Sequence, residues 1–365
     1  MEHAVASRLI KNNLRRISTP LLAATLAFAP LTSAIAQTLP QSLYAPGNDD
    51  LQSVVQKAIS TNPEVEAAWS RLSAAKNDIG VARGNYLPSI DVSAGVGREA
   101  QEGDGRGSYE TDFVELTLTQ MLFDGFATRS EVERLDRAEL VTYYELIGAS
   151  ENVALEAAEA YLDVARYREL VRLAQENYAK HQEVYQQIEE RTLSGAGRGV
   201  DLEQISGRVS LAESNLMTEA TNLHDVTARY MRIVGDLPAQ NLMPAPTLED
   251  ELPASVSEAV NLAFEGNPDF HAAIENINVQ RAEREGTRAA FMPQLEIQGR
   301  TGTNNQDDAI TGRRDETSIQ LVASMNLYNG GSDRAAFRAA SDRIEEAVDQ
   351  RELACTNVRQ TTNCL

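Results

Sequence analysis

The two halves of this chain carry the same short motifs at one constant spacing. Three motifs of the first half return in the second: Asn62-Pro63 as Asn267-Pro268, Tyr86-Leu87-Pro88 as Phe291-Met292-Pro293, and Leu122-Phe123-Asp124-Gly125 as Leu327-Tyr328-Asn329-Gly330. The members of each pair lie 205 positions apart (267 − 62, 291 − 86 and 327 − 122), so the halves align without a net insertion. Because solenoid repeats span only about 20 to 50 residues, each half is expected to be a large block of helices and strands. We predict a first repeat at 37–248, a second at 249–365, and a quasi-symmetric, ring-like assembly.

The segment 1–36 is predicted to be a secretory signal peptide. A basic stretch that includes Arg15 and Arg16 precedes an apolar run, and Ala34-Ile35-Ala36 forms a small-residue cleavage motif before Gln37. The alternative is an uncleaved membrane anchor. Beyond this segment no apolar run reaches the about 18 residues that a membrane-spanning helix needs, so any crossing of a membrane would use strands.

The charge argues against a nucleic-acid-binding protein, and the positions of the cysteines argue against a fold held together by disulfides. The chain has 33 basic and 54 acidic residues and a formal net charge of −21, which argues against a nucleic-acid partner. Cys355 and Cys364 are the only cysteines, and they lie too close to the C-terminus to form a disulfide framework for the body of the chain. A local or intermolecular disulfide and two free thiols are both compatible with the sequence.

Four segments alternate apolar and polar residues with the period of a β-strand. We predict strands at about 88–97, 111–122, 293–300 and 317–328, paired as two hairpins with polar loops. Such alternation is typical of outer-membrane β-barrels, with a hairpin of a soluble β-sandwich as the alternative. In a barrel one apolar set is predicted to face lipid, namely Val92, Leu116, Ile297 and Leu321. A polar set is predicted to line the lumen, namely Asp91, Glu115, Glu296 and Gln320.

A very long helix is predicted at about 127–192, because this segment has no proline and a single glycine. At about 1.5 Å per residue it would be about 100 Å long. Apolar residues recur at coiled-coil spacing along its second half, and a return helix is predicted at about 201–235 after a glycine-rich turn. Asp201 is expected to cap this return helix, and Gly195 and Gly199 are expected to adopt backbone conformations that favour glycine.

The turn between these helices carries a family signature. Arg191-Thr192-Leu193-Ser194-Gly195, followed six positions later by Asp201-Leu202, resembles the R-x-x-x-G-x-x-x-x-x-D-L motif of the TolC family of outer-membrane efflux and secretion ducts. The resemblance implies a mainly α homotrimer, with long antiparallel coiled-coil helices forming a periplasmic α-barrel. The two hairpins would contribute four strands to a β-barrel in outer-membrane lipid. Four strands alone cannot enclose a barrel, since about eight is the practical minimum.

The resemblance also implies a function, that of a passive channel in a tripartite efflux or type I secretion system. The channel would dock a periplasmic adaptor and an ABC or RND-type inner-membrane transporter through a tip formed by Arg191, Gly195, Gly199, Asp201 and Leu202. The sequence shows no nucleophile with a nearby base, no metal-ligand spacing and no phosphate loop, so we expect neither an enzyme nor a cofactor. A structural or adhesive periplasmic coiled coil is the alternative function.

The second repeat is shorter than the first. The first repeat's long helix and return helix end near 235, so a complete second repeat would reach about 440 (235 + 205), whereas the sequence has 365 residues. We therefore expect only a partial long helix in the second repeat, as in a C-terminally truncated member of the family. A non-functional truncated member is a further alternative.

Overall fold

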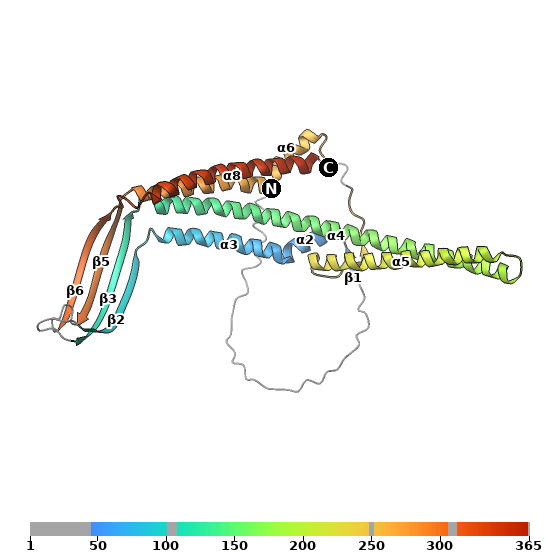
Figure 1. Cartoon of the computed structure of the whole chain (residues 1–365), viewed down its shortest axis with the longest axis horizontal. Helices are drawn as coiled ribbons and strands as arrows, with labels where there is room; N and C mark the ends of the chain where they lie inside the picture. Colours follow the sequence, from blue (N-terminus) through green and yellow to red (C-terminus); the bar gives the residue numbers. More distant parts are fainter. Residues whose placement is uncertain (1–44, 101–107, 248–251, 306–311, 364–365) are drawn as a thin grey trace, which may run out of the picture. The chain divides into compact units, whose positions relative to one another are not determined.

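The computed structural model describes residues 45–100, 108–247, 252–305 and 312–363, all of which belong to one compact unit (Figure 1). The predicted signal peptide at 1–36 and Cys364 lie outside the described residues. Within those ranges, none of the helices combines the length and the apolar character needed to cross a membrane.

The same order of elements occurs twice. The first set consists of β1 (Ala45–Asp49), α2 (Leu51–Thr61), α3 (Pro63–Gly84), β2 (Ser89–Ala100), β3 (Ser108–Phe123), α4 (Ala127–Leu193), α5 (Gly199–Val234) and β4 (Ala239–Leu242). The second set consists of α6 (Val256–Gly266), α7 (Pro268–Thr287), the short 3-10 helix η2 (Arg288–Phe291), β5 (Gln294–Asn305), β6 (Arg313–Ser324) and α8 (Ser332–Asn363). Two helices, two strands and a long helix thus recur in each set.

The repeated Asn-Pro motif ends one helix and starts the next. Asn62 follows the last residue of α2, and its side chain accepts a hydrogen bond from the N–H of Glu64 at 2.9 Å in the first turn of α3. Asn267 does the same for α7, accepting from the N–H of Phe270 at 2.8 Å. The following proline occupies the first helical position, where its missing N–H costs nothing. The motif is therefore a structural break that both repeats need.

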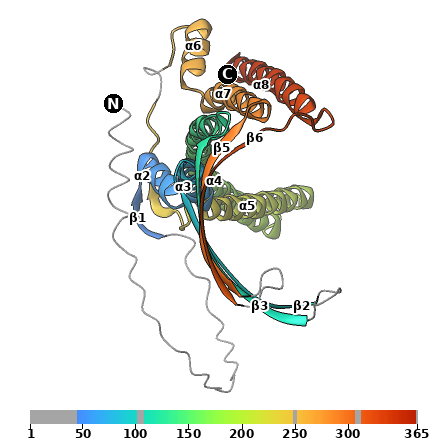
Figure 2. The same cartoon turned by 90° about the vertical axis from the view of Figure 1, so that its left-hand side faces the viewer.

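The two hairpins form one antiparallel sheet in the order β2-β3-β5-β6 (Figure 1), which Figure 2 shows nearly edge-on. The first hairpin pairs Ser89 with Thr119 and continues to Ala100 opposite Ser108. The repeats meet where β3 pairs with β5, and β2 and β6 form the two edges. The helices next to the strands are packed in the matching order, α3 on α4, α4 on α7 and α7 on α8. Strands that are neighbours in the sheet are therefore connected in sequence to helices that are also neighbours.

All four strands differ from their predicted bounds, β2 and β3 by up to three residues and β5 and β6 by more. β5 continues past the predicted end near 300, because Asn305 pairs with Asp112 of β3 and its side-chain amide donates to that carboxylate at 3.0 Å. The prediction of a strand as far as 328 is wrong, since β6 ends at Ser324, opposite the first residue of β5. Beyond that point Asn326 accepts a hydrogen bond from the N–H of Tyr328 at 3.0 Å in a local turn.

The main core lies where α2, α4 and α5 meet. Its buried members come from all three helices and are Val54, Ala58, Val153, Ala157, Ala160, Tyr161, Val164, Tyr230, Ile233 and Val234. The coiled-coil residues farther along α4, such as Tyr178 and Tyr185, are only half-buried. The helical period therefore predicts which side of α4 meets α5, and the α4 residues of this seam are fully buried where α2 adds a third layer.

Hydrogen bonds attach the short parallel sheet of β1 and β4 to this core. The Tyr161 hydroxyl donates to the carbonyl oxygens of Asp49 and Met243, at 3.0 and 2.6 Å. The Asp49 carboxylate accepts from the N–H of Ala239 at 3.1 Å. Burial, together with the nearby charge of Asp49, raises the pKa of the Tyr230 hydroxyl. The Tyr161 hydroxyl thus binds backbone that is remote in the sequence, and the Tyr230 hydroxyl donates to the Asp49 carboxylate at 3.5 Å.

Tyr161→Phe is expected to lower the free energy of unfolding by about 0.5 to 1.5 kcal/mol, because two part-buried carbonyl groups lose the one hydroxyl proton that they share. Urea unfolding followed by circular dichroism measures this change. Tyr143→Phe is the matched control, since the Tyr143 side chain is 42% exposed. Equal destabilisation by both substitutions would contradict this role of the Tyr161 hydroxyl.

Candidate functional site: a two-faced sheet and a helical tip

The register of the sheet places the four predicted lipid-facing residues on one face. Residues that pair directly across antiparallel strands share a face, as do residues two apart along a strand. Val92 pairs with Leu116, and Ile297 pairs with Leu321. Leu116 also pairs with Thr301, which lies four residues from Ile297 and so on the same face. Val92, Leu116 and Leu321 are exposed, by 71%, 41% and 66%.

The four predicted lumen residues lie together on the opposite face. Asp91 pairs with Thr117, whose hydroxyl donates to the Glu115 carboxylate at 3.1 Å. Gln320 pairs with Gln298, whose side-chain amide donates to the Glu296 carboxylate. The sheet therefore separates the polar set from the apolar set, across both repeats. That the polar face lines a lumen stays a prediction.

The apolar face extends well beyond these four residues. Its other exposed members are Ile90, Val96, Val114, Leu118 and Ile319. An exposed apolar surface of this size is uncommon on a soluble monomer and marks a contact with lipid or protein. Phe113 lies on the polar face instead: its ring covers Gly95, where an added Cβ would come within 2.5 Å of it. Alternation alone does not predict this exception.

Exposed aromatic side chains gather where the strands meet the helices. The four junctions contribute Tyr86, Phe126, Phe291 and Tyr328, whose exposed fractions run from 44% to 84%. Phe126 has a left-handed backbone (φ 68°), and its ring meets that of Phe123 edge to face at 5.2 Å. Aromatic residues flank the apolar band of membrane barrels. Sequence reasoning missed this group, although all four residues belong to the repeated motifs or directly follow one.

The tip between α4 and α5 is built on a left-handed glycine. Gly195 has φ 80°, its N–H donates to the carbonyl of Thr192, and the N–H of Ala196 donates to the carbonyl of Arg191. These two bonds form a Schellman motif, which ends a helix by using its last free carbonyl groups. The expectation for Gly195 is confirmed.

Two other expectations for the tip are wrong. Gly199 has no left-handed backbone, and the crowded glycine is Gly197, where an added Cβ would lie 2.8 Å from Thr192 Oγ1. Asp201 does not cap α5, because the helix begins at Gly199 and Arg198 occupies the cap position. The Asp201 carboxylate lies in the first turn and accepts a hydrogen bond from Arg198 Nε at 3.3 Å. There it still interacts favourably with the helix dipole.

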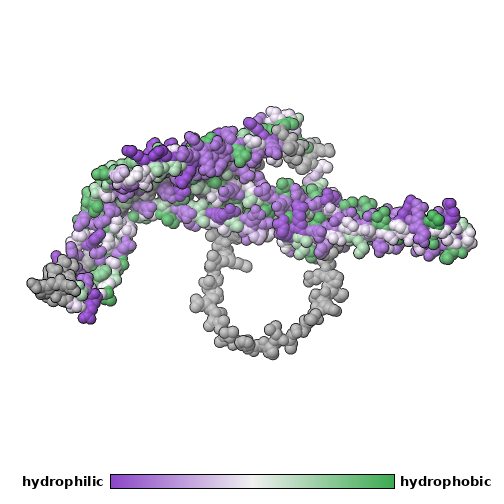
Figure 3. Space-filling view, in the orientation of Figure 1, coloured by the Kyte–Doolittle hydropathy of each residue, from purple (hydrophilic) through white to green (hydrophobic). Residues whose placement is uncertain are grey.

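The outer surface of the tip is partly apolar. Leu193 and Val200 are 82% and 77% exposed, and Arg191 is exposed beside them, whereas Leu202 is half-buried. Figure 3 shows apolar residues at the surface of this end of the helical pair. Leu193 and Val200 lie within the predicted tip but are not among the contact residues named from the sequence. The described part of the chain holds no group of three or more His, Cys, Asp or Glu arranged to bind a metal ion.

Gly195→Ala and Gly199→Ala are expected to change stability in opposite directions. The first forces a side chain into a left-handed conformation at a cost of about 1 to 2 kcal/mol. In Gly199→Ala the added Cβ has no neighbour within 4 Å, so this substitution should leave the stability of the protein unchanged or raise it by about 0.4 to 1 kcal/mol. Thermal unfolding of both variants measures the two effects, and a shift of the same sign in both would contradict this assignment of the turn.

Comparison with known proteins agrees with this arrangement. A family model described as "Outer membrane efflux protein" matches residues 54–236 and 259–363. The outer membrane efflux protein BepC of Brucella suis is 26% identical over 318 residues, which cover 86% of this chain and 68% of BepC. The alkaline protease secretion protein AprF of Pseudomonas aeruginosa is 25% identical, over 80% of this chain and 63% of AprF. The chain thus spans about two thirds of the length of these relatives.

Solved structures share the fold. The Campylobacter jejuni outer membrane channel CmeC superposes with a TM-score of 0.74 at 16% identity, over 84% of this chain and 68% of CmeC. CusC superposes with a TM-score of 0.72 at 17% identity, over 92% of this chain and 81% of CusC. At such identities the likeness concerns the fold alone.

Proposed function

Because the chain belongs to the outer membrane efflux protein family, we propose that it is a subunit of an outer-membrane channel that works as a passive conduit. The observation that carries this proposal is the separation of polar and apolar residues on the two faces of one four-stranded sheet. A sheet with one face in lipid and one in water requires this separation. A structural or adhesive coiled coil has no use for it.

The two open edges of the sheet support a homotrimer. β2 and β6 each leave one row of backbone N–H and C=O groups without a strand partner in the sheet. In lipid these groups have to be paired, because no water is available to them. If β6 of one copy pairs with β2 of the next, three copies give about 12 strands, enough for an aqueous bore.

The helices support a periplasmic duct that continues the sheet. α4 has 67 residues, which corresponds to about 100 Å, and α5 packs along its second half. The tip of this pair then lies far from the membrane, and we assign it as the contact for a periplasmic adaptor, through Arg191, Gly195, Gly199, Asp201 and Leu202, with Leu193 and Val200 added. The inner-membrane partner would be an ABC or RND-type transporter.

The names of the relatives support transport and not catalysis. BepC is named for efflux and AprF for protease secretion. Both kinds of export suit a conduit that performs no chemistry on its cargo. We therefore assign the chain to the outer membrane, extending into the periplasm, in either a tripartite efflux system or a type I secretion system.

The test is assembly and conductance of the full chain. The protein is purified from outer membranes in mild detergent, its mass is measured by light scattering, and it is added to a planar lipid bilayer. Three copies per particle and discrete single-channel currents are the expected result. A monomer recovered from the periplasmic fraction, without currents, would contradict the proposal.

A further inference from the structure

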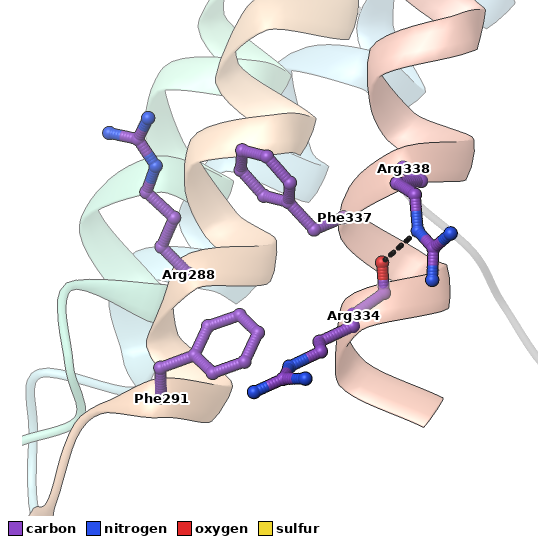
Figure 4. Close-up of a pocket in the computed structure, with 5 residues that line it drawn as sticks. All are labelled: Arg288, Phe291, Arg334, Phe337 and Arg338. Atoms are coloured by element: carbon purple, nitrogen blue, oxygen red, sulfur yellow. Dashed lines mark hydrogen bonds between the residues drawn. The ribbon is translucent and has the colours of Figure 1, made fainter. Parts of the chain in front are cut away.

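A groove lies between η2 and the start of α8, beside the end of the sheet. Arg288 and Phe291 line it from η2, and Arg334, Phe337 and Arg338 line it from α8 (Figure 4). Its volume is about 460 Å³. Figure 4 shows the rings of Phe291 and Phe337 on its two sides and the Arg334 guanidinium directed toward Phe291, whereas the Arg338 guanidinium lies on the opposite side of α8. Positive charge and apolar surface are thus combined in one site.

The groove is cationic in a strongly acidic chain, whose formal net charge is −21. Arg288 is partly neutralised, since Glu285 pairs with it at 2.7 Å, and its guanidinium lies 5.5 Å from the centre of the Phe337 ring. For Arg334 and Arg338 the described residues provide no ion-pair partner. Arg338 Nε donates to the backbone carbonyl of Arg334 at 3.4 Å, which leaves the rest of its guanidinium for a ligand. Two guanidinium groups are therefore available to an anion.

The position of the groove identifies the kind of anion. Phe291 immediately precedes Met292-Pro293 and the first residue of β5, at the level of the exposed junction aromatics Tyr86, Phe126 and Tyr328. Under the proposed function these aromatics mark the boundary between membrane and periplasm. The arginines lie just on the helical side of that boundary, which is the depth of lipid phosphate groups.

We propose that this groove binds the headgroup of an anionic phospholipid from the periplasmic leaflet, an inference that rests on the proposed membrane placement. Arg334 binds the phosphate, and the exposed Arg338 side chain joins it by a change of rotamer toward the groove, because a planar guanidinium donates two parallel hydrogen bonds to phosphate oxygens. Phe291 and Phe337 contact the glycerol and the first methylene groups. A free phosphate ion would leave these rings without a partner, so the apolar lining favours a lipid.

The test measures lipid binding to the full chain in detergent by native mass spectrometry, with phosphatidylglycerol as the probe. The double variant Arg334→Gln/Arg338→Gln is expected to bind it about tenfold more weakly, because two charge-assisted contacts are lost. The matched control is Arg71→Gln/Arg208→Gln, which removes the same charge from two exposed positions on α3 and α5. Its affinity should stay within about twofold of the unmodified chain.

Two further measurements distinguish binding of a lipid from binding of a free phosphate ion. Inorganic phosphate at the same concentration is expected not to displace the lipid, and Phe337→Ala is expected to weaken lipid binding while the protein still inserts into membranes. Equal lipid binding by the two double variants would overturn the inference, and so would full displacement by inorganic phosphate. Either of these results with normal insertion leaves the proposed function standing. Failure of the unmodified chain to insert would instead overturn the proposed function, and this inference with it.

Discussion

Val92→Arg is expected to destabilise the membrane-inserted assembly by about 2 to 4 kcal/mol, because it places a charge on the face proposed to meet lipid near the middle of the bilayer. Val92 is the fourth of the 12 residues of β2 and is 71% exposed in the single chain. Leu321→Arg in β6 should have the same effect, since Leu321 lies on the same face. Urea titration of protein inserted into lipid vesicles measures the loss, and the yield of heat-resistant trimers in outer membranes gives a second readout.

The matched controls are the neighbouring positions on the polar face. Ser93→Arg adds the same charge one residue away, opposite the Glu115 carboxylate, and Gln320→Arg does so beside Leu321. Both should change stability by less than about 1 kcal/mol, because an exposed charge in water costs little. If the polar face proves as sensitive as the apolar face, the sheet does not separate lipid from water.

The strand faces were predictable because a strand has a period of two. Apolar residues at every second position already assign Val92 and Leu116 to one side of their strands. The pairing of β3 with β5, which joins the repeats, keeps those sides together. A shift of one residue there would have placed Ile297 on the polar face. The apolar pattern thus predicts the faces, and it restricts the register to shifts by an even number of residues.

The ends of the elements were harder to predict, because partners remote in the sequence decide them. Thr301 to Asn305 have no apolar alternation, yet they continue β5 because β3 and β6 pair with them on both sides. The short strand β4 lies in a proline-rich segment and forms because β1 pairs with it in parallel. Local patterns do not contain such pairings.

The tip shows the limit of assigning caps from residue type. Asp201 is a favoured cap residue, and its position after a glycine-rich turn suggested that role. The helix nevertheless starts two residues earlier, at Gly199, because the Schellman motif at Gly195 reverses the chain within a few residues. Helix ends are the least reliable part of a sequence-based assignment, since they depend on the turn before them.

The repeated Phe-Asp-Gly and Tyr-Asn-Gly segments after β3 and β6 provide an internally controlled test of the junction. Asp124 accepts a hydrogen bond from the N–H of Thr128 at 2.7 Å in the first turn of α4. Gly125 and Gly330 then both turn the chain with a left-handed backbone, at φ 70° and 74°. Their surroundings differ: a Cβ on Gly125 would lie 2.9 Å from the carbonyl oxygen of Ala289, whereas nothing lies within 4 Å of one on Gly330.

Gly125→Ala is therefore expected to cost about 2 to 5 kcal/mol, the sum of about 1 to 2 for the left-handed backbone and about 1 to 3 for overpacking against η2. Gly330→Ala should cost only the backbone part. Gly80→Ala, within α3 and free of neighbours, should instead stabilise by about 0.5 to 1 kcal/mol. Urea unfolding of the three variants measures each change. If Gly125→Ala costs no more than Gly330→Ala, the contact with Ala289 does not hold the two repeats together at the end of the sheet. A larger cost at Gly125 would show that the start of α4 is fixed there against the second repeat.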